Sequence, residues 1–314
     1  PGLEADGEKV WTYKEAMVPE AMPASLLVVG SGAIGMEFAS FYADMGTEVT
    51  VVEVLDRILP VEDEEISAFA HKTFEKRGIK LITGAKITDL DKSGDGVSAT
   101  IESKDGTATL AVEKVIMAVG ITGNVEDVGL ENTKVEVDRG HIVIDQWCQT
   151  GEPGVYAIGD IVRTPLLAHT ASAEALLAVD HIAGKEPKPL DYNLNPNCTY
   201  SSPEVASVGL TEEAAIKAGY TIKTGKFPFS ALGKARIMNQ IDGFVKVVAD
   251  AKYDEVLGVH IIGPRATDLI AEASMGMKLE TTVEEMAHTI HAHPTLPEAV
   301  LEAAHAAMGR PIHM

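Results

Sequence analysis

Cysteine is scarce in this chain. Of its 314 residues, Cys148 and Cys198 alone carry a thiol, and they form neither a CxxC nor a CxxxxC pair. A zinc finger or a local redox disulfide needs such close spacing, so neither is expected and no metal site is predicted. Both thiols are interpreted as packing residues of a protein from a reducing compartment.

Long apolar runs and an excess of basic residues are missing as well. No stretch approaches the roughly 18 consecutive apolar residues of a membrane helix, so no membrane contact is predicted. Lysine and arginine total 26 against 47 acidic residues, which gives a formal net charge of −21. Nucleic-acid binding needs clustered cations, so this balance argues against it. With 46% hydrophobic residues, the composition is typical of a soluble protein of two or three domains.

The first third of the chain alternates between strand and helix patterns. "SLLVVG" (25–30) and "EVTVVE" (48–53) are short apolar runs typical of buried parallel strands. Helical spacing follows each run, over about 34–45 and 63–77, and "IKLIT" (79–83) is a third short strand. The order strand–helix–strand–helix–strand predicts a doubly wound, Rossmann-type α/β domain.

The period then changes from helical spacing to alternation. Residues 86–112 alternate apolar and polar side chains and are broken at "KSGDG" and "KDG", which predicts an antiparallel meander. "EKVIMAVG" (113–120) returns to a buried strand. These patterns and the Pro-rich stretch "KEPKPLDYNLNPN" divide the chain into a connecting segment (1–23), a dinucleotide-binding domain (24–121), a central segment (122–190) and an α+β C-terminal domain (191–314).

A glycine-rich turn joins the first strand to the first helix. "VVGSGAIGMEF" contains Gly30-x-Gly32-x-x-Gly35, and Glu53 ends the next strand, the context of a dinucleotide site. Gly30 permits a tight turn, Gly32 lets a pyrophosphate approach the backbone, and Gly35 allows close packing. The carboxylate of Glu53 would accept ribose hydroxyls and repel a 2′-phosphate, so NAD is predicted rather than NADP. The alternative is a glycine turn without a ligand.

Three stretches together resemble the pyridine nucleotide–disulfide oxidoreductases, flavoproteins with two dinucleotide folds. They are the glycine loop, "GVYAIGD" (154–160), which is similar to the second flavin signature, and "HAHPTLPE" (291–298), which is similar to the C-terminal catalytic motif. The resemblance covers essentially the whole chain. It implies an NAD site formed by Gly30, Ser31, Gly32, Ala33, Ile34, Gly35, Met36, Glu37, Glu53, Ile87 and Gly120. It implies FAD contacts from Asp160, Leu166, Leu167, Ala168 and His169.

Two of these residues also have ordinary interpretations. By resemblance Glu37 would lie near the nicotinamide and the flavin, but a glutamate in the first turns of a helix is common without a ligand. His169 would line the flavin site or cap a loop.

The sequence departs from the family in one large respect. Family members begin with a further strand–GxGxxG–helix unit that holds the ADP part of FAD, followed by a CxxxxC redox disulfide, and this sequence shows neither. The beginning, "PGLEADGEKV", is interpreted as a cut. We therefore expect the chain to correspond to the C-terminal two thirds of such an enzyme. It should bind NAD, not retain FAD, and be inactive by itself.

His293 and Glu298 form the predicted catalytic dyad. Pro294 disfavours a helical His293, so the imidazole should lie on a loop, and the resemblance implies a cis bond before Pro294. Pro297 suits the first position of a helix, which places Glu298 in its first turn. A glutamate bonded to one ring nitrogen makes the other a better base. The alternative is a structural pair that caps the helix.

The pairing of "HAHPT" with Glu53 most resembles the family members that oxidise dihydrolipoamide with NAD⁺. That resemblance implies electron transfer from dihydrolipoamide through the disulfide and FAD to NAD⁺. It also implies a homodimer formed through residues 191–314, docking on the acyltransferase core of a 2-oxo acid dehydrogenase complex, and a bacterial cytoplasmic or mitochondrial matrix location. The alternatives are another NAD-linked disulfide reductase or transhydrogenase of the family, and a non-catalytic NAD-binding dimerisation module.

Overall fold

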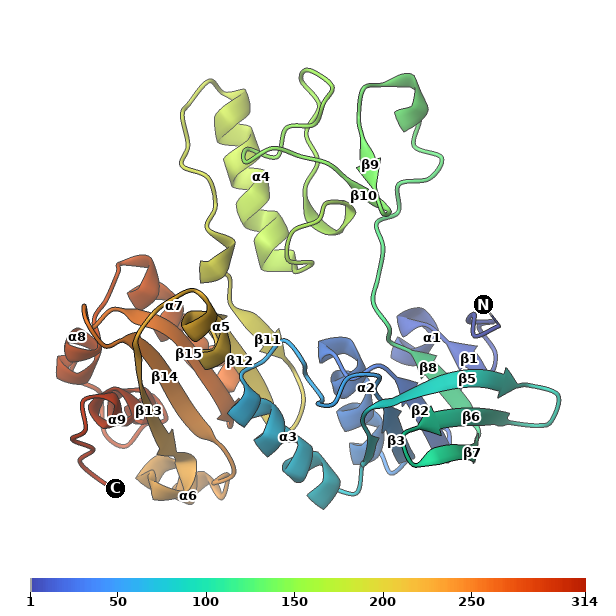
Figure 1. The fold of residues 1–314 in the computed structure, drawn as a ribbon, viewed down its shortest axis with the longest axis horizontal. Helices are drawn as coiled ribbons and strands as arrows, with labels where there is room; N and C mark the ends of the chain where they lie inside the picture. The colour runs from blue at the N-terminus through green and yellow to red at the C-terminus, as the bar shows by residue number, and fades with distance from the viewer. Residues whose placement is uncertain (1) are drawn as a thin grey trace. The chain divides into compact units, whose positions relative to one another are not determined.

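A computed structural model describes residues 2–314 of the chain (Figure 1). The chain divides into two units, one formed by the chain up to Val119 together with Pro196–Met314, and one formed by Gly120–Asn195. The predicted domain boundaries stay predictions, and no sequence pattern indicated that 24–121 and 191–314 pack into one unit. No helix among residues 2–314 is long and apolar enough to cross a membrane.

The first unit contains a five-stranded parallel sheet. Helices α2 (Ala33–Asp44) and α3 (Glu64–Lys76) follow its central strands, and the short helix α1 (Tyr13–Met17) precedes them. The doubly wound α/β prediction is confirmed. The strand order is β1 (Val10–Trp11), β8 (Lys114–Met117), β2 (Ser25–Val29), β3 (Glu48–Val52) and β4 (Lys80–Ile82), and all neighbours are parallel. Residues 1–23, which were interpreted as a connecting segment, contribute the edge strand β1.

The predicted meander covers one face of this sheet (Figure 1). Its strands are β5 (Ala85–Asp91), β6 (Val97–Ser103) and β7 (Gly106–Val112), all antiparallel. Leu27 and Val29 of β2 pack toward the meander, whereas Leu26 and Val28 pack toward the helices. Both faces of β2 are therefore buried, which explains its continuous apolar sequence.

An antiparallel sheet forms the C-terminal part of the same unit. Its strands, in spatial order, are β11 (Asn197–Thr199), β12 (Glu204–Gly209), β15 (Val256–Gly263), β14 (Phe244–Asp250) and β13 (Ile222–Pro228). The single strand-like run "TYSSPEVASVGL" is split by Pro203, which cannot donate to a strand ladder. The helices are α5 (Glu212–Lys217), α6 (Gly233–Met238), α7 (Ala266–Lys278), α8 (Val283–His288) and α9 (Glu298–Ala307), with a 3₁₀ turn η4 (Phe229–Ala231).

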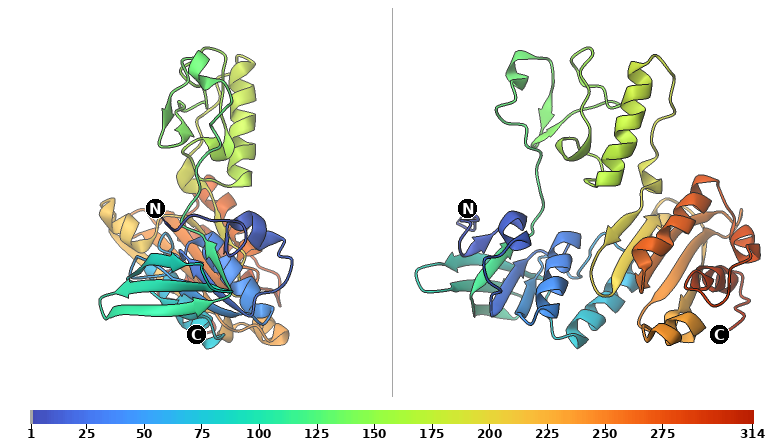
Figure 2. Two further views of the ribbon diagram at one scale, coloured as in Figure 1. Left: turned by 90° about the vertical axis from the view of Figure 1, so that its right-hand side faces the viewer. Right: turned by 180° about the vertical axis from the view of Figure 1, so that it is seen from behind.

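Helices α7 and α9 pack against this sheet, α7 on β12 and β15 and α9 on β13 and β14 (Figure 2). Val205, Phe244 and Ile262 share a core with residues of α2, α3 and the parallel sheet. This shared apolar core is the reason that the two sheets belong to one unit.

The second unit is mostly irregular. Its helix α4 (Ala168–Ile182) includes Glu174, whose buried carboxylate accepts the Gly159 N–H and the Tyr192 hydroxyl. Residues 154–158, which precede Asp160, form no strand; Tyr156 makes an isolated bridge with Gln149. The remaining elements are η1 (Leu130–Asn132), β9 (Val137–Asp138), β10 (His141–Ile142), η2 (Gly159–Ile161) and η3 (Tyr192–Leu194).

A buried lysine joins the start of α3 to the antiparallel sheet. Lys246 Nζ lies 2.9 Å from Asp63 Oδ1, 2.9 Å from Glu65 Oε2 and 2.7 Å from Glu212 Oε2, and its side chain is 2% exposed. Burial lowers the pKa of Lys246, but the three carboxylates outweigh this effect and hold the pKa above its usual range. The lysine therefore stays charged, and removal of one partner would leave a poorly compensated charge.

Glu62 precedes this junction and is itself buried. Its Oε2 atom has no hydrogen-bond partner among the described residues. Burial raises the pKa of Glu62 to about 7; the neighbouring Asp63 carboxylate adds to the shift and the Ser207 hydroxyl opposes it. The unfolded chain loses this proton near the ordinary pKa of 4.5, before the folded chain does. The contribution of Glu62 to stability therefore falls as pH rises through this window.

Glu62→Gln should remove that part of the pH dependence. Between about pH 4.5 and pH 8 the ionisation of Glu62 should lower the wild-type free energy of unfolding by roughly 2–4 kcal/mol, and the variant should lack this loss. Urea unfolding at several pH values measures it. Glu64→Gln, an exposed neighbour, should keep the wild-type slope. A Glu62→Gln slope equal to wild type would show that Glu62 ionises normally.

Candidate dinucleotide site and histidine–glutamate dyad

The glycine loop between β2 and α2 is shaped by two close backbone approaches. Gly30 has φ 99°, and a Cβ on it would collide with the carbonyl oxygen of Ala118 at the end of β8. A Cβ on Gly35 would collide with the carbonyl oxygen of Gly30. Only glycine fits at these two positions, so the first turn of α2 lies directly against the strands.

Gly32 differs from the other two glycines. It has φ −66°, and a Cβ built on it would meet no atom within 4 Å. It is the N-cap of α2 and supplies no side-chain cap, so the first-turn N–H groups of Ala33 and Ile34 are open to a ligand. This is the geometry that accepts a phosphate at a helix N-terminus.

Glu53 at the end of β3 locks this loop. Its Oε2 accepts the Ser31 N–H at 2.8 Å and the Ser31 hydroxyl at 2.7 Å, and its Oε1 accepts the Leu55 N–H at 2.9 Å. A carboxylate offers about four acceptor positions, so one on Oε1 stays open for a ribose hydroxyl. The sequence predicted the ligand role of Glu53 but not this structural role.

The other predicted NAD residues lie in different surroundings. Met36 and Ile87 are buried in the apolar core, so any contact with a dinucleotide would come from their backbones. Glu37 accepts the Tyr200 N–H at 2.8 Å. Burial raises the pKa of Glu37, and the hydrogen bond from Tyr200 opposes the shift. Gly120 belongs to the second unit and has φ 115°.

The predicted FAD residues lie at two adjoining places in the second unit. Asp160 is exposed in η2, and η2 packs against α4. Leu167 is the N-cap of α4 and makes no side-chain cap. An exposed carboxylate beside an uncapped helix N-terminus fits the hydroxyl groups of a flavin ribityl chain. Leu166, Ala168 and His169 flank that N-terminus.

His293 and Glu298 are in contact, as predicted. His293 Nδ1 lies 2.8 Å from Glu298 Oε1, and the Thr295 N–H donates to Glu298 Oε2 at 2.7 Å. The His293–Pro294 bond is cis, and α9 begins at Glu298 with Pro297 as its N-cap. Burial opposes ionisation of Glu298, but the Thr295 N–H and His293 outweigh it and hold the pKa below its usual range.

The hydrogen bond to Glu298 defines the state of the His293 ring. A carboxylate oxygen accepts, so in the neutral ring Nδ1 carries the proton and Nε2 has the lone pair. The His293 side chain is 76% exposed. The free Nε2 can therefore accept a proton from an approaching group.

Two further histidine–glutamate hydrogen bonds were not predicted. His291 Nε2 lies 2.7 Å from Glu272 Oε1, and His313 Nδ1 lies 2.6 Å from Glu302 Oε1. Their partners are 19 and 11 positions away, so no local spacing reveals them. Among the described residues no cluster of three or more His, Cys, Asp or Glu side chains is arranged to hold a metal ion.

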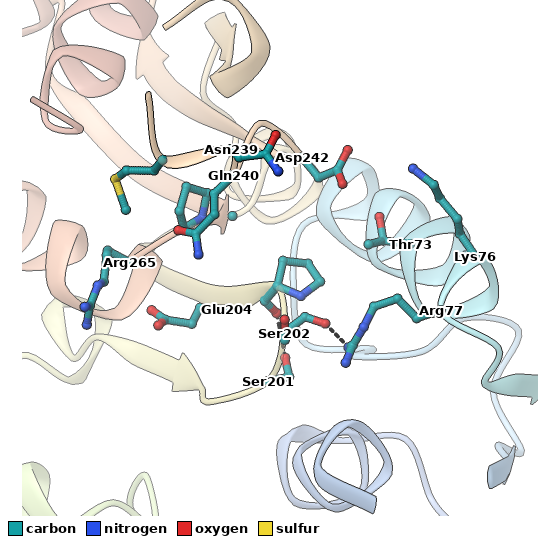
Figure 3. A pocket seen from close by; sticks show the side chains of 14 residues that line it. Thr73, Lys76, Arg77, Ser201, Ser202, Glu204, Asn239, Gln240, Asp242 and Arg265 are labelled. Atoms are coloured by element: carbon teal, nitrogen blue, oxygen red, sulfur yellow. Dashed lines mark hydrogen bonds between the residues drawn. The ribbon is translucent and has the colours of Figure 1, made fainter. Parts of the chain in front are cut away.

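A cavity of about 550 Å³ lies between the end of α3 and the edge of the antiparallel sheet (Figure 3). Arg77 donates to the Ser202 carbonyl oxygen inside it, and Arg265 and Glu204 line the opposite wall. The cavity contains none of the predicted site residues. It therefore does not account for the dinucleotide or dyad predictions.

Comparison with known proteins identifies the family of the chain. Residues 1–175 match the family model described as pyridine nucleotide-disulphide oxidoreductase, and residues 195–304 match the dimerisation domain of that family. The chain belongs to the pyridine nucleotide-disulphide oxidoreductase family, and its predicted fold class is confirmed. The first match begins at residue 1 and does not support the expected lack of an N-terminal segment.

The similar proteins are more specific. The dihydrolipoyl dehydrogenase of Bacillus subtilis is 49% identical over 100% of this chain and 66% of its own length. That of Zymomonas mobilis is 46% identical over 100% of this chain and 68% of its own length. The crystal structure of LpdA from Mycobacterium tuberculosis has a TM-score of 0.89 at 29% identity, covering 97% of this chain and 66% of that one. The chain thus spans about two thirds of the length of these relatives.

Gly32→Ala and Gly35→Ala should separate ligand binding from folding. Gly35→Ala forces α2 away from Gly30 and should lower the free energy of unfolding by roughly 1–3 kcal/mol. Gly32→Ala has open space and should stay within about 0.5 kcal/mol of wild type. Its methyl group occupies the phosphate position, so NADH affinity should fall roughly tenfold or more. Urea unfolding and calorimetric titration measure the two effects. Wild-type NADH affinity in Gly32→Ala would place the pyrophosphate elsewhere.

Proposed function

We propose that this chain supplies the NAD-binding site and the general base of a flavoprotein that converts dihydrolipoamide and NAD⁺ to lipoamide and NADH. The observation that carries the proposal is the 2.8 Å contact between His293 and Glu298, which leaves an exposed Nε2 lone pair. The names of the relatives at 46–49% identity support the same reaction.

The dyad suits the first proton transfer of that reaction. A dithiol attacks a disulfide only as the thiolate, so a base must first remove a thiol proton. Nε2 of His293 takes that proton, and Glu298 stabilises the resulting imidazolium through Nδ1–H. The exposed position of His293 gives a thiol substrate access to it.

The glycine loop and Glu53 form the proposed NAD site. The pyrophosphate would contact the open amides of α2 beside Gly32, and the adenosine ribose would use the open position on Glu53 Oε1. Ser31, Ala33 and Ile34 would line the same turn. Glu37, Ile87 and Gly120 stay proposals by resemblance.

FAD, when bound, would carry the electrons between the dithiol and the nicotinamide. Of this chain's residues, Asp160 and the start of α4 would hold it, because they offer an exposed carboxylate beside a helix N-terminus that has no side-chain cap. The chain has no CxxxxC pair of its own. We therefore expect the 314-residue polypeptide by itself neither to retain FAD nor to oxidise dihydrolipoamide.

The partners follow from the C-terminal match. We propose a homodimer formed through the antiparallel-sheet region, supported by the dimerisation-domain match over residues 195–304. Docking on the acyltransferase core of a 2-oxo acid dehydrogenase complex, in a bacterial cytoplasm or a mitochondrial matrix, remains part of the proposal. A second candidate is a non-catalytic NAD-binding dimerisation module, favoured by the absence of a CxxxxC pair in the sequence.

NADH should bind the chain roughly tenfold or more tightly than NADPH. In the proposed site the buried carboxylate of Glu53 would lie close to a 2′-phosphate, and two like charges repel each other. Calorimetric titration with both cofactors measures the ratio. Glu53→Gln keeps the shape, removes the charge and should reduce the preference. Equal affinities in the wild-type chain would reject NAD selectivity.

His293→Gln should lower dihydrolipoamide oxidation by about 10²–10⁴-fold, because glutamine cannot act as a base. The assay needs a flavin-containing protein that carries these residues together with a CxxxxC disulfide. Oxidation of NADH by an artificial acceptor omits the dithiol step and should change little. His305→Gln on α9 serves as the matched control. Near-wild-type dihydrolipoamide turnover in His293→Gln would leave the dyad without a catalytic role.

A further inference from the structure

His291 lies two residues before His293 and is held at both ring nitrogens. Its Nδ1 lies 2.9 Å from the Thr289 carbonyl oxygen, and its Nε2 lies 2.7 Å from Glu272 Oε1 on α7. The side chain of His291 is 6% exposed, against 76% for His293. The first histidine of "HAHPT" therefore points into the protein and the second points out.

Both partners of His291 are acceptors. Carbonyl and carboxylate oxygens donate no proton, and a neutral imidazole has one N–H. Only the imidazolium form donates to Thr289 and Glu272 at the same time. The acceptor on Glu272 is a carboxylate, and hydrogen bonds to an ionised acceptor are shorter and stronger than neutral ones.

The segment between α8 and α9 contains no helix or strand, so side-chain hydrogen bonds are needed to hold it in place. After His293, the Thr295 hydroxyl donates to the Ala292 carbonyl oxygen at 2.7 Å, and the Thr295 N–H donates to Glu298. Before His293, the contact of His291 with Glu272 ties the segment to α7. His293 lies between these two attachments, so both of them limit the directions that its ring can take.

We propose that His291 and Glu272 form a positioning pair that holds the loop of His293 against α7. The pair keeps His293 Nδ1 on Glu298 and leaves Nε2 directed to solvent. His291 does not touch the substrate in this arrangement; it acts through His293. The inference rests on the proposed catalytic role of the His293–Glu298 dyad, but its structural consequence can be measured without turnover.

The test uses the 314-residue chain labelled with ¹⁵N in its histidines. Long-range proton–nitrogen spectra report which nitrogen of His293 carries the proton when the ring is neutral. In the wild type this should be Nδ1. His291→Phe removes both donors, and Glu272→Ala removes the acceptor on α7. In both variants the His293 signals should shift toward those of a freely exchanging imidazole.

Two variants provide matched controls. Glu272→Gln keeps an oxygen that can accept from Nε2 of His291, so it should restore the wild-type His293 signals. His71→Gln breaks another histidine–glutamate pair, with Glu75 on α3, and should leave His293 unchanged. A loss of packing alone would lower the melting temperature without changing the tautomer of His293.

Unchanged His293 signals in folded His291→Phe and Glu272→Ala would overturn the proposal. If His291→Phe does not fold, Glu272→Ala decides alone, because Glu272 is only partly buried at the surface of α7. A shifted His293 tautomer with normal dihydrolipoamide turnover in the flavin-containing protein would uphold the positioning pair and reject the proposed function. The positioning pair and the proposed function can therefore be rejected independently of each other.

Discussion

The contact between Gly35 and Gly30 sets the geometry of the proposed NAD site. It brings the first turn of α2 directly onto the carboxyl end of β2, where Gly30 in turn lies against Ala118 of the neighbouring strand. A methyl group at Gly35 would push the helix away from the end of β2, and one at Gly30 would collide with the Ala118 carbonyl oxygen after β8. With the helix so close, its unpaired amides point to the open space beside Gly32, and Glu53 can reach Ser31 to lock the turn. In the proposed site, the phosphate position is thus formed by backbone packing alone.

A buried charge network has a comparable role at the junction between the two sheets. Lys246 is separated from Asp63 by 183 positions, yet the two meet at 2.9 Å with Glu65 and Glu212 around them. Desolvation of one lysine is costly, and the three carboxylates around it offset that cost. These contacts tie the start of α3 to β14. The apolar contacts of Val205, Phe244 and Ile262 then complete the shared core.

Sequence patterns predicted those features whose signals are local. The doubly wound order, the meander and the glycine loop follow from short-range periodicity, and the His293–Glu298 pair lies within five residues. Features that depend on distant partners were missed. The two-residue strand β1 has too little pattern of its own, and it forms because β8 offers an edge. No local sequence pattern indicates the role of His291, because Glu272 is brought to it only by the packing of α7.

A structure of the chain with bound NADH would test the central claim most directly. The account predicts the pyrophosphate on the amides of Ala33 and Ile34 beside Gly32, and an adenosine ribose hydroxyl on Glu53 Oε1. NADH bound away from the glycine loop, or a ribose that does not contact Glu53, would contradict it.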